Sequence, residues 1–288
     1  MMAQIIDLPD FMINHIDLNN ISKIKKIYLF FKGLLIGYLH KNTNKNLFCL
    51  VMNIFFKKSG KIFYEEGFYG KITDDSSNIY FPNKRIDRLI VNYKNHLNHL
   101  FKSYCLEEIT FFDNDLIVDC GSNVGELYLA FKQKNLNVKY IGFEPDERAY
   151  ECLLKNIDLN NNNIHNLALS NKNKKEKLFL DTYGANTSLV DFGSSEAVQV
   201  ETRTLDSFEI MNIKLLKIDA EGFELEVLEG AKQTLKNVEY VSVDFGPERG
   251  IDETKTMTTV IPYLLINNFE FIHTFKGRDV GLFKNKKN

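Results

Sequence analysis

Patterns that would place this chain of 288 residues in several common protein classes are missing from it. The four cysteines are scattered without a CxxC pair, which argues against a cysteine-based zinc site and fits a reducing compartment. The longest apolar stretch, residues 27–39, is interrupted by Lys32 and falls short of the ~20 residues that a membrane-spanning helix needs. The first residues carry acids where a secretory signal has a basic region. We therefore expect a cytoplasmic protein.

The chain also lacks an excess of positive charge. It carries 36 Lys and Arg against 38 Asp and Glu, for a formal net charge of -2 and a pI near 6.3. A chain without an overall basic field does not concentrate nucleic acid around itself. Nucleic acid is therefore not an expected partner.

One stretch lacks acids altogether. Residues 21–61 contain no Asp or Glu, whereas nine lysines flank or interrupt two apolar runs, 27–39 and 47–56. An anionic membrane surface attracts such basic and apolar segments, so one hypothesis is peripheral contact with the cytoplasmic face of a membrane, near a lipid-linked or membrane-proximal acceptor. The alternative, which we favour at this stage, is a small helical subdomain within a mainly helical extension, residues 1–104, whose apolar runs form a core or a dimer interface. The oligomeric state cannot be read.

From residue 105 onward, short apolar runs alternate with helical patterns. Runs this apolar are typical of strands covered on both faces of a parallel sheet. The alternation predicts a doubly wound α/β domain over residues 105–288, with ligands bound beyond the carboxyl ends of the strands. The expected strands are residues 115–120, 138–144, 164–169, 213–219, 238–245, 269–275 and 279–284, and the expected helices are 124–134, 146–158, 223–236 and 256–267.

Two further segments frame this alternation. Residues 175–208 read as extended pieces around a loop rich in Gly, Ser and Asn, which predicts an inserted hairpin over the sheet edge. Upstream, apolar residues recur every three or four positions across residues 85–104, which predicts one helix with one face on the core.

The segment LIVDCGSNVGEL, residues 116–127, predicts a ligand-binding turn. Gly121 and Gly125 allow a tight turn and a close approach to a ligand, and the free N–H groups of the following helix offer donors to a negative group. The dinucleotide fingerprint G-x-G-x-x-G is absent. Asp119 would repel a pyrophosphate but attract an α-ammonium group.

Glu144 ends the next expected strand, in the segment FEP, about 20 residues past Gly125. An acid at this position accepts hydrogen bonds from ribose hydroxyls. A ligand with a ribose, an amino group and a carboxylate but no phosphate is S-adenosylmethionine, which we predict as the cofactor.

At this point the sequence resembles the FkbM family of S-adenosylmethionine-dependent methyltransferases, roughly over residues 105–275, through VDCGSNVGE, GFEPDERAYECLLKNI, NLALSN, RTLDSF and LLKIDAEGFELEVLEGA in this order. The resemblance implies a class I methyltransferase, Rossmann-like fold: a mixed, mostly parallel sheet with helices on both faces and an antiparallel last strand. It also implies methylation of an oxygen, often a sugar hydroxyl in a glycan or natural product. Carried over by position, the cofactor-binding residues are Asp119, Gly121, Ser122, Asn123, Gly125, Glu144, Pro145, Asn166 and Ala168.

The catalytic residues are expected in KIDAEGFE, after the fourth strand. Methyl transfer to a hydroxyl needs in-line approach and a group that takes the hydroxyl proton. Asp219 is the first candidate for this base or for a substrate anchor, and Glu221 is the second, although Glu221 could equally complement a helix dipole. A divalent ion could bind to Asp219, Glu221 and Asp244, but no metal is predicted.

Three residues are candidates for contacting the acceptor. Arg249 in GPERG and Arg203 before TLDSF could hold a carboxylate or phosphate, although for Arg203 we favour a surface salt bridge. Asp244 stands where many relatives have a glutamate.

The sequence thus favours an O-methyltransferase acting on a sugar of a glycan or glycoconjugate of the cell-surface polysaccharide type. The alternatives are a non-catalytic module that binds S-adenosylmethionine and a methyltransferase for a non-sugar natural product. A dinucleotide enzyme and a methyltransferase of DNA bases are disfavoured, because both the glycine fingerprint and an Asn/Asp-Pro-Pro-Tyr/Phe segment are missing. The acceptor cannot be read, since its pocket would involve the N-terminal region and residues 175–208.

Overall fold

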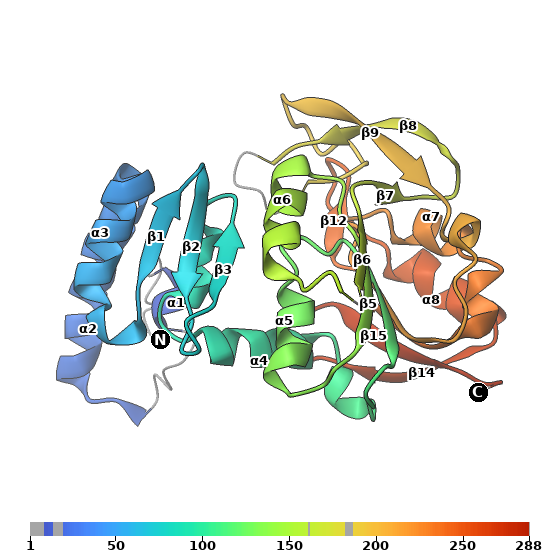
Figure 1. The fold of residues 1–288 in the computed structure, drawn as a ribbon, viewed down its shortest axis with the longest axis horizontal. Helices are drawn as coiled ribbons and strands as arrows, with labels where there is room; N and C mark the ends of the chain where they lie inside the picture. The colour runs from blue at the N-terminus through green and yellow to red at the C-terminus, as the bar shows by residue number, and fades with distance from the viewer. Residues whose placement is uncertain (1–8, 14–19, 161, 182–186, 288) are drawn as a thin grey trace. The chain divides into compact units, whose positions relative to one another are not determined.

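The structure, a computed structural model, describes residues 9–13, 20–160, 162–181 and 187–287 (Figure 1). The chain divides into two compact units, Met1–His96 and Leu97–Asn288. The division falls inside helix α4 (Tyr93–Ser103), slightly before the boundary at residue 104 that we expected from the sequence.

The N-terminal unit contains a sheet as well as helices, so the expectation of a mainly helical extension is incomplete. Its three strands pair antiparallel in the order β1-β2-β3. The turn between β1 and β2 consists of Glu66 and Gly67, both with positive φ, as a two-residue hairpin requires. The elements are α1 (Asp10–Ile13), α2 (Lys23–Asn42), α3 (Lys45–Phe55), η2 (Lys57–Ser59), β1 (Ile62–Glu65), β2 (Phe68–Ile72), β3 (Asn78–Phe81) and η3 (Lys84–Leu89).

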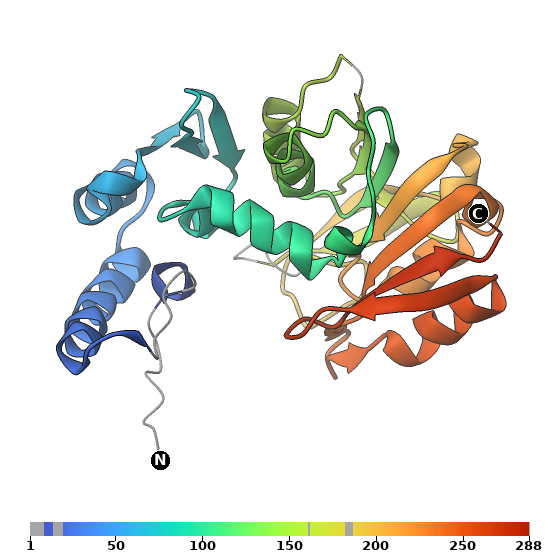
Figure 2. The ribbon, with the colours of Figure 1, turned by 90° about the horizontal axis from the view of Figure 1, so that it is seen from below.

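The C-terminal unit is built on a seven-stranded sheet in the order β14-β15-β11-β10-β4-β5-β6. Strand β15 pairs antiparallel with both β14 and β11, and the other neighbouring strands pair parallel, which confirms the mixed, mostly parallel sheet with an antiparallel last strand. Figure 2 shows β14 and β15 in red at one edge of this sheet. The strands are β4 (Leu116–Cys120), β5 (Lys139–Phe143), β6 (Asn162–His165), β10 (Ile213–Ile218), β11 (Val238–Asp244), β14 (Phe269–Thr274) and β15 (Val280–Asn285).

Helices cover both faces of the sheet, as predicted. Helices α5 (Glu126–Gln133) and α6 (Glu147–Asn156) lie on one face, and α7 (Glu224–Glu229) and α8 (Met257–Ile266) lie on the other (Figure 1). Helix α7 is shorter than the predicted helix 223–236. At its end, a Cβ at Gly230 would lie 2.0 Å from the carbonyl oxygen of Ser170, so the chain contacts the segment around Ser170 there, and a separate turn, η6 (Thr234–Asn237), follows.

The range of the predicted hairpin insertion, residues 175–208, contains most of two paired strands. Strands β8 (Lys174–Phe179) and β9 (Ala197–Arg203) pair antiparallel, and β7 (Ala168–Leu169) joins β9 to complete a small second sheet. The predicted strand 164–169 is therefore two strands, β6 and β7, in different sheets. The remaining short elements are η4 (Leu106–Glu108), η5 (Leu205–Phe208), β12 (Pro247–Arg249) and β13 (Thr254–Lys255).

The predicted helix 85–104 is wrong as a single element. It is divided into η3 and α4, with a turn between them. The side chain of Asn92 accepts a hydrogen bond from the N–H of Asn95 at 3.0 Å, so the chain starts α4 with a new cap. Periodicity alone does not register such an interruption, because the apolar spacing continues across it.

Candidate active site

The loop after β4 has the tight geometry that its glycines predict. Gly121, Asn123 and Gly125 all have positive φ, at 75°, 47° and 87°. A Cβ at Gly121 would lie 1.9 Å from the carbonyl oxygen of Asp219, so this glycine lets the loop touch the chain that leaves β10. A Cβ at Gly125 would lie 2.9 Å from Cδ1 of Leu153 in α6. The loop therefore joins the carboxyl ends of two central strands.

Glu144, at the end of β5, faces this loop. Its carboxylate accepts hydrogen bonds from the N–H groups of Asn123 at 2.7 Å and Asp146 at 2.9 Å. Only 7% of the residue is exposed, and burial raises the pKa of its carboxyl group to about 7. The amide of Asn166 donates to the carbonyl oxygens of Glu144 at 2.9 Å and Pro145 at 3.3 Å. Four predicted cofactor residues thus share one hydrogen-bonded group.

The residues around Glu144 fit the nucleoside part of S-adenosylmethionine. A carboxylate offers about four lone-pair positions, and the two backbone donors leave capacity for the two ribose hydroxyls. The Cβ positions of Gly121 and Gly125 face the chain itself, at the carbonyl oxygen of Asp219 and at the side chain of Leu153, so the two glycines allow the loop to pack closely beside Glu144. Two other predicted cofactor-binding residues, Ser122 and Ala168, are buried. Oγ of Ser122 donates to the carbonyl oxygen of Asp119 at 2.8 Å, and Ala168 lies in β7.

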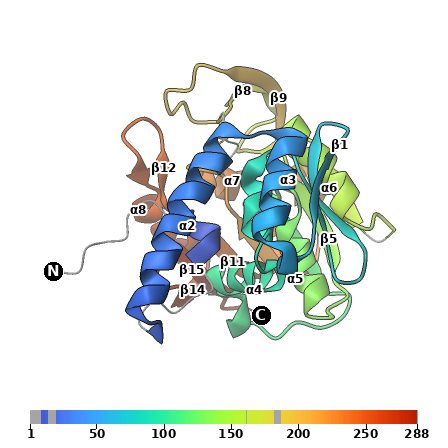
Figure 3. The same cartoon turned by 90° about the vertical axis from the view of Figure 1, so that its left-hand side faces the viewer.

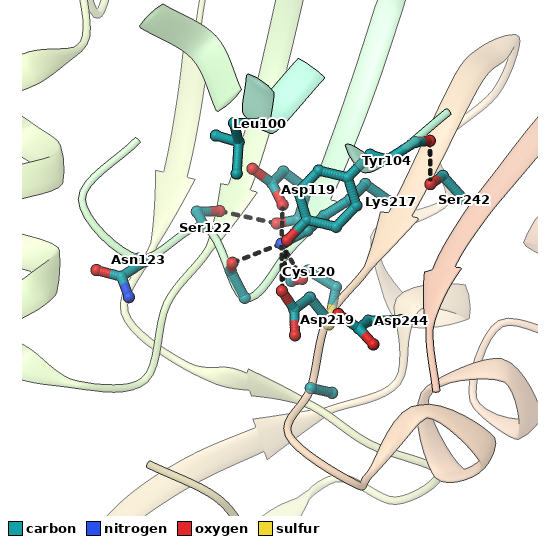
Figure 4. A network of polar contacts seen from close by, with 12 residues as sticks. Leu100, Tyr104, Asp119, Cys120, Ser122, Asn123, Lys217, Asp219, Ser242 and Asp244 are labelled. Carbon is teal, nitrogen blue, oxygen red and sulfur yellow. Dashed lines mark hydrogen bonds and ion pairs between the residues drawn. The ribbon is translucent and has the colours of Figure 1, made fainter. Parts of the chain in front are cut away.

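Asp119 is placed differently from the prediction that it attracts an α-ammonium group of the ligand. Its carboxylate is 1% exposed and is bound by the ammonium of Lys217 at 2.9 Å (Figure 4). It also accepts a hydrogen bond from the hydroxyl of Tyr140. Lys217 also donates to the carbonyl oxygens of Cys120 at 3.2 Å and Gly121 at 2.8 Å. Asp119 therefore acts on the loop indirectly, by holding the lysine that fixes its carbonyl groups.

Lys217 is a functional candidate that sequence reasoning missed. It lies opposite Asp119 in the parallel pairing of β10 with β4, and its side chain is 4% exposed. Burial alone would lower its pKa, but the negative charge of Asp119, with contributions from Tyr104 and Asp219, raises the pKa instead. Lys217 therefore keeps its positive charge. The signal in the sequence was a lysine, the second of two, inside the otherwise apolar run IKLLKI.

Asp219 lies at the centre of a second polar group. Its Oδ2 accepts a hydrogen bond from the hydroxyl of Tyr104, and the ammonium of Lys217 lies 4.0 Å away (Figure 4). The same oxygen accepts from Nη2 of Arg278 at 2.8 Å. Burial opposes ionisation of this carboxyl group, but Lys217, Arg278 and Tyr104 together hold its pKa below the ordinary value. Its Oδ1 has no hydrogen-bond partner among the described residues. Asp219 is thus an anion with one oxygen left to accept a hydrogen bond.

Three carboxylates meet beside this group, but they are not the three that we predicted. Oxygens of Asp219, Glu221 and Glu248 lie within 4.8 Å of one another. Asp244 instead binds Nε of Arg278 at 2.6 Å and the N–H of Gly246 at 3.0 Å. Glu248, which sequence reasoning missed, takes the place expected for Asp244. Oxygens at these separations could share a divalent cation.

Glu248 is the most perturbed acid of this cluster. Its burial, followed by the negative charges of Asp219, Asp244 and Glu224, raises the pKa of its carboxyl group to about 8. Its Oε2 has no hydrogen-bond partner in the part of the chain that the structure describes. A carboxyl group with a pKa near neutral pH is suited to accept a proton.

The alternative role considered for Glu221, support of the following helix, is filled by Glu224. Glu224 is 1% exposed, and its carboxylate accepts from the N–H of Gly222 at 2.8 Å and from the hydroxyl of Thr256 at 2.8 Å. Glu221 has a φ of 49°, and its carbonyl oxygen accepts from Oγ of Ser188 at 2.6 Å. Because Ser188 belongs to the hairpin insertion, the insertion borders the acid cluster.

The two arginines predicted to bind an acceptor are engaged by acids of the chain. Arg249 binds both carboxylate oxygens of Glu226, at 2.6 and 2.9 Å, and the carbonyl oxygen of Gly222 at 2.7 Å. Arg203 pairs with Glu201 at 2.7 Å, with about half of each side chain exposed, as the salt-bridge reading of the sequence expected. The charge of each guanidinium is therefore already paired with a carboxylate of the chain.

Comparison with known proteins identifies the family. The Methyltransferase FkbM domain matches residues 119–271, slightly more than half of the chain. Methyltransferase sdnD of Sordaria araneosa is 27% identical over 173 residues, which are 46% of this chain and 67% of that protein. Methyltransferase 1 of Beauveria bassiana is 27% identical over 188 residues, 56% of this chain and 74% of that protein.

Among solved structures, Methyltransferase FkbM from Methylobacillus flagellatus aligns with a TM-score of 0.45 and 16% identity. The alignment covers 69% of this chain and 52% of that chain, so the match extends over about half the length of that protein. The match of the family domain over residues 119–271 carries the assignment, and it includes both the glycine loop and the acid cluster. This chain belongs to the FkbM family of S-adenosylmethionine-dependent methyltransferases.

Proposed function

We propose that this protein transfers the methyl group of S-adenosylmethionine to a hydroxyl oxygen of a sugar in a glycan or glycoconjugate. The observation that carries the proposal is the contact between the glycine loop and the acid cluster, where a Cβ at Gly121 would lie 1.9 Å from the carbonyl oxygen of Asp219. A proton acceptor beside the loop that holds the methyl donor is the arrangement that O-methylation needs.

The acids of the cluster have different roles in this reaction, because their surroundings differ. When bound, S-adenosylmethionine supplies an electrophilic methyl carbon on a positively charged sulfur. Asp219 is held ionised, and its unpartnered Oδ1 can accept a hydrogen bond from the acceptor hydroxyl and so orient it. Glu248, with its pKa raised to about 8 by burial, removes the proton from that hydroxyl. Glu221, the second catalytic candidate from the sequence, lies with both and helps to position the acceptor.

A sugar suits this cluster better than an acidic acceptor. Sugar hydroxyls ionise weakly, so their methylation requires a base, and their O–H groups pair well with several carboxylates. A phosphate or carboxylate has no O–H group to donate to Asp219, Glu221 and Glu248, and it would lie beside the negative charge of Asp219. The two cations beside Asp219, Arg278 and Lys217, are already engaged by acids of the chain.

The experiment is to measure S-adenosylhomocysteine formation with S-adenosylmethionine and a panel of acceptors. The panel contains nucleotide sugars, oligosaccharides, phenols and carboxylic acids, each with wild type, Glu248→Gln and Glu253→Gln. Glu253 is an exposed acid five residues from Glu248 and serves as the matched control. We expect turnover with a sugar only, a decrease of ~10²-fold or more in Glu248→Gln, and none in Glu253→Gln.

Other outcomes contradict separate parts of the proposal. Turnover with a phenol or carboxylic acid alone would replace the sugar acceptor by a non-sugar natural product. Binding of S-adenosylhomocysteine without turnover on any acceptor would favour a non-catalytic binding module. Full activity of Glu248→Gln would show that Glu248 is not the base and would favour Asp219 as the base instead.

A further inference from the structure

Helix α2 of the N-terminal unit has two apolar faces, and only one of them is buried by the residues that the structure describes. The buried residues of this helix of 20 residues are Leu29, Gly33 and Ile36. A second set of large apolar residues recurs every three or four positions and is 45% to 81% exposed, so it forms one continuous stripe on the other side of the helix. Its members are Ile24, Ile27, Tyr28, Phe31, Leu34, Leu35 and Tyr38.

Helix α3 repeats this arrangement. Phe48, Cys49 and Met52 are buried, whereas another set at a spacing of three and four residues is 55% to 67% exposed. Figure 3 shows α2 and α3 both nearest the viewer on this side of the N-terminal unit. We call the exposed sets of both helices the outward stripe, which in α3 consists of Leu47, Leu50 and Ile54. Exposed apolar residues in so regular a pattern mark an interaction surface.

Lysines border the outward stripe on both sides. Lys23 and Lys41 are one helical turn from Ile27 and Tyr38, and residues three or four apart are neighbours on a helix surface. On the other side, Lys25 lies one turn from Tyr28, and Lys32 lies one turn from Leu35. An apolar stripe between two rows of lysine is the pattern of a helix that lies in the plane of a membrane interface.

The charge of this part of the chain decides between possible occupants. Residues 21–61 carry nine lysines and no acid, a formal charge of +9, so the remainder of the chain carries -11. In a symmetric dimer the same surface would face itself, and these lysines would meet lysines without an acid from the segment to pair with them. A bilayer with anionic headgroups supplies both the negative charge and the apolar layer.

We propose that the outward stripe docks onto the surface of an anionic phospholipid bilayer, with α2 lying in the headgroup region. None of the described helices is long and apolar enough to cross a membrane, so the contact is confined to one leaflet. The proposal uses only the N-terminal unit and does not depend on the reaction proposed above.

The experiment is flotation of the full chain with vesicles of phosphatidylcholine alone or with 30% phosphatidylglycerol. We expect binding to the anionic vesicles and at least a tenfold loss of binding on neutral vesicles or in 0.5 M salt. The variant Phe31→Ser/Leu35→Ser removes two exposed members of the outward stripe and should bind at least tenfold more weakly. The control Ile266→Ser removes an apolar residue of α8 that is 83% exposed and should bind like wild type.

A second measurement distinguishes the bilayer from a second copy of the chain. Light scattering after size exclusion gives the oligomeric state of wild type and Phe31→Ser/Leu35→Ser. Equal flotation of the two proteins, or no flotation with anionic vesicles, would overturn the proposal. A dimer that Phe31→Ser/Leu35→Ser converts into a monomer would assign the outward stripe to a second copy instead.

Discussion

Arg278 donates from Nη2 to Oδ2 of Asp219 at 2.8 Å. Its Nε donates to Asp244 at 2.6 Å, and its guanidinium carbon lies 4.4 Å from the centre of the ring of Tyr104. One cation therefore joins the acids that follow β10 and end β11, and holds Asp219 as an anion. Glu248 has no comparable partner among the described residues, which explains why its proton is held more tightly.

Replacing Arg278 should both destabilise the protein and slow the reaction. Arg278→Gln leaves Asp219 and Asp244 as buried acids with less compensation, and because the guanidinium is 31% exposed we expect a decrease of about 1–3 kcal/mol in the free energy of unfolding. Urea denaturation measures this decrease. Arg278→Lys keeps the charge but loses the planar fork, so it should recover part of the stability but little of the activity. An unchanged free energy of unfolding in Arg278→Gln would show that the two pairs do not form.

A side chain at Gly121 should disrupt the protein, whereas a side chain at Gly193, a glycine with a similar φ, should be tolerated. Gly121→Ala places a Cβ 1.9 Å from the carbonyl oxygen of Asp219, whereas Gly193→Ala, at a φ of 88°, meets no atom within 4 Å. Both variants carry the strain of a positive φ, so the comparison isolates the collision. A saturating ligand at 100 times its Kd adds about 2.7 kcal/mol of stability.

We expect Gly193→Ala to retain the increase in Tm with S-adenosylhomocysteine and Gly121→Ala to lose it. Differential scanning fluorimetry measures both, with the Tm of each unliganded variant as the control for folding. A full ligand-induced increase in Gly121→Ala would contradict the assignment of this loop to the cofactor.

Much of the C-terminal fold was predictable because its signals are local. Each strand was an apolar run of a few residues, and the glycine loop and Glu144 lie within about 20 residues of each other in a recognisable order. The sheet of the N-terminal unit was missed because its strands are only four or five residues long and its turn, Glu66 and Gly67, is no standard hairpin signal.

The polar partners of the acids could not be predicted in this way. Tyr104 and Asp219 are 115 residues apart in sequence, and Arg278 and Asp219 are 59 residues apart. Such pairs arise only when α4 and the loop between β14 and β15 fold against the ends of the central strands. The sequence marks Glu248 only as one acid in a turn, and its raised pKa depends on burial beside other acids.

Glu144→Gln should weaken binding of the cofactor without unfolding the protein. The amide oxygen can still accept one of the two backbone hydrogen bonds that Glu144 accepts, but the charged acceptor for ribose is lost. Hydrogen bonds to charged groups contribute about 1.5–3 kcal/mol, so we expect a Kd for S-adenosylhomocysteine roughly 10 to 100 times higher, measured by calorimetry. Glu147→Gln, an exposed acid of α6, should bind like wild type.

The rate should rise with pH in the range where Glu248 loses its proton. Burial and neighbouring acids raise the pKa of Glu248 to about 8, and only the carboxylate can accept a proton from the acceptor. We therefore expect kcat/KM to increase from pH 6.5 and to level off above about pH 8.5, as measured with saturating S-adenosylmethionine. If Asp219 were the base, kcat/KM would be flat across this range, since the pKa of Asp219 lies below its ordinary value.

Glu224 should make the protein less stable as the pH rises from acid to neutral. Burial raises the pKa of this carboxyl group from 4.5 to about 7, so between these pH values the folded chain keeps a proton that the unfolded chain has lost. The free energy of unfolding therefore falls through this window, and Glu144 and Glu248, whose pKa values are raised to about 7 and about 8, add to the fall.

Glu224→Gln removes one of these three contributions, because its amide stays neutral at every pH in the window. Relative to wild type, the variant should gain about 1–3 kcal/mol between pH 5 and pH 8, since each unit of pKa shift corresponds to about 1.4 kcal/mol. Urea denaturation at four pH values measures the two curves, and Glu253→Gln, an exposed acid, should follow the wild-type curve. Parallel curves for wild type and Glu224→Gln would mean that Glu224 is ionised in the folded protein, with its carboxylate charge stabilised by the N–H of Gly222 and the hydroxyl of Thr256.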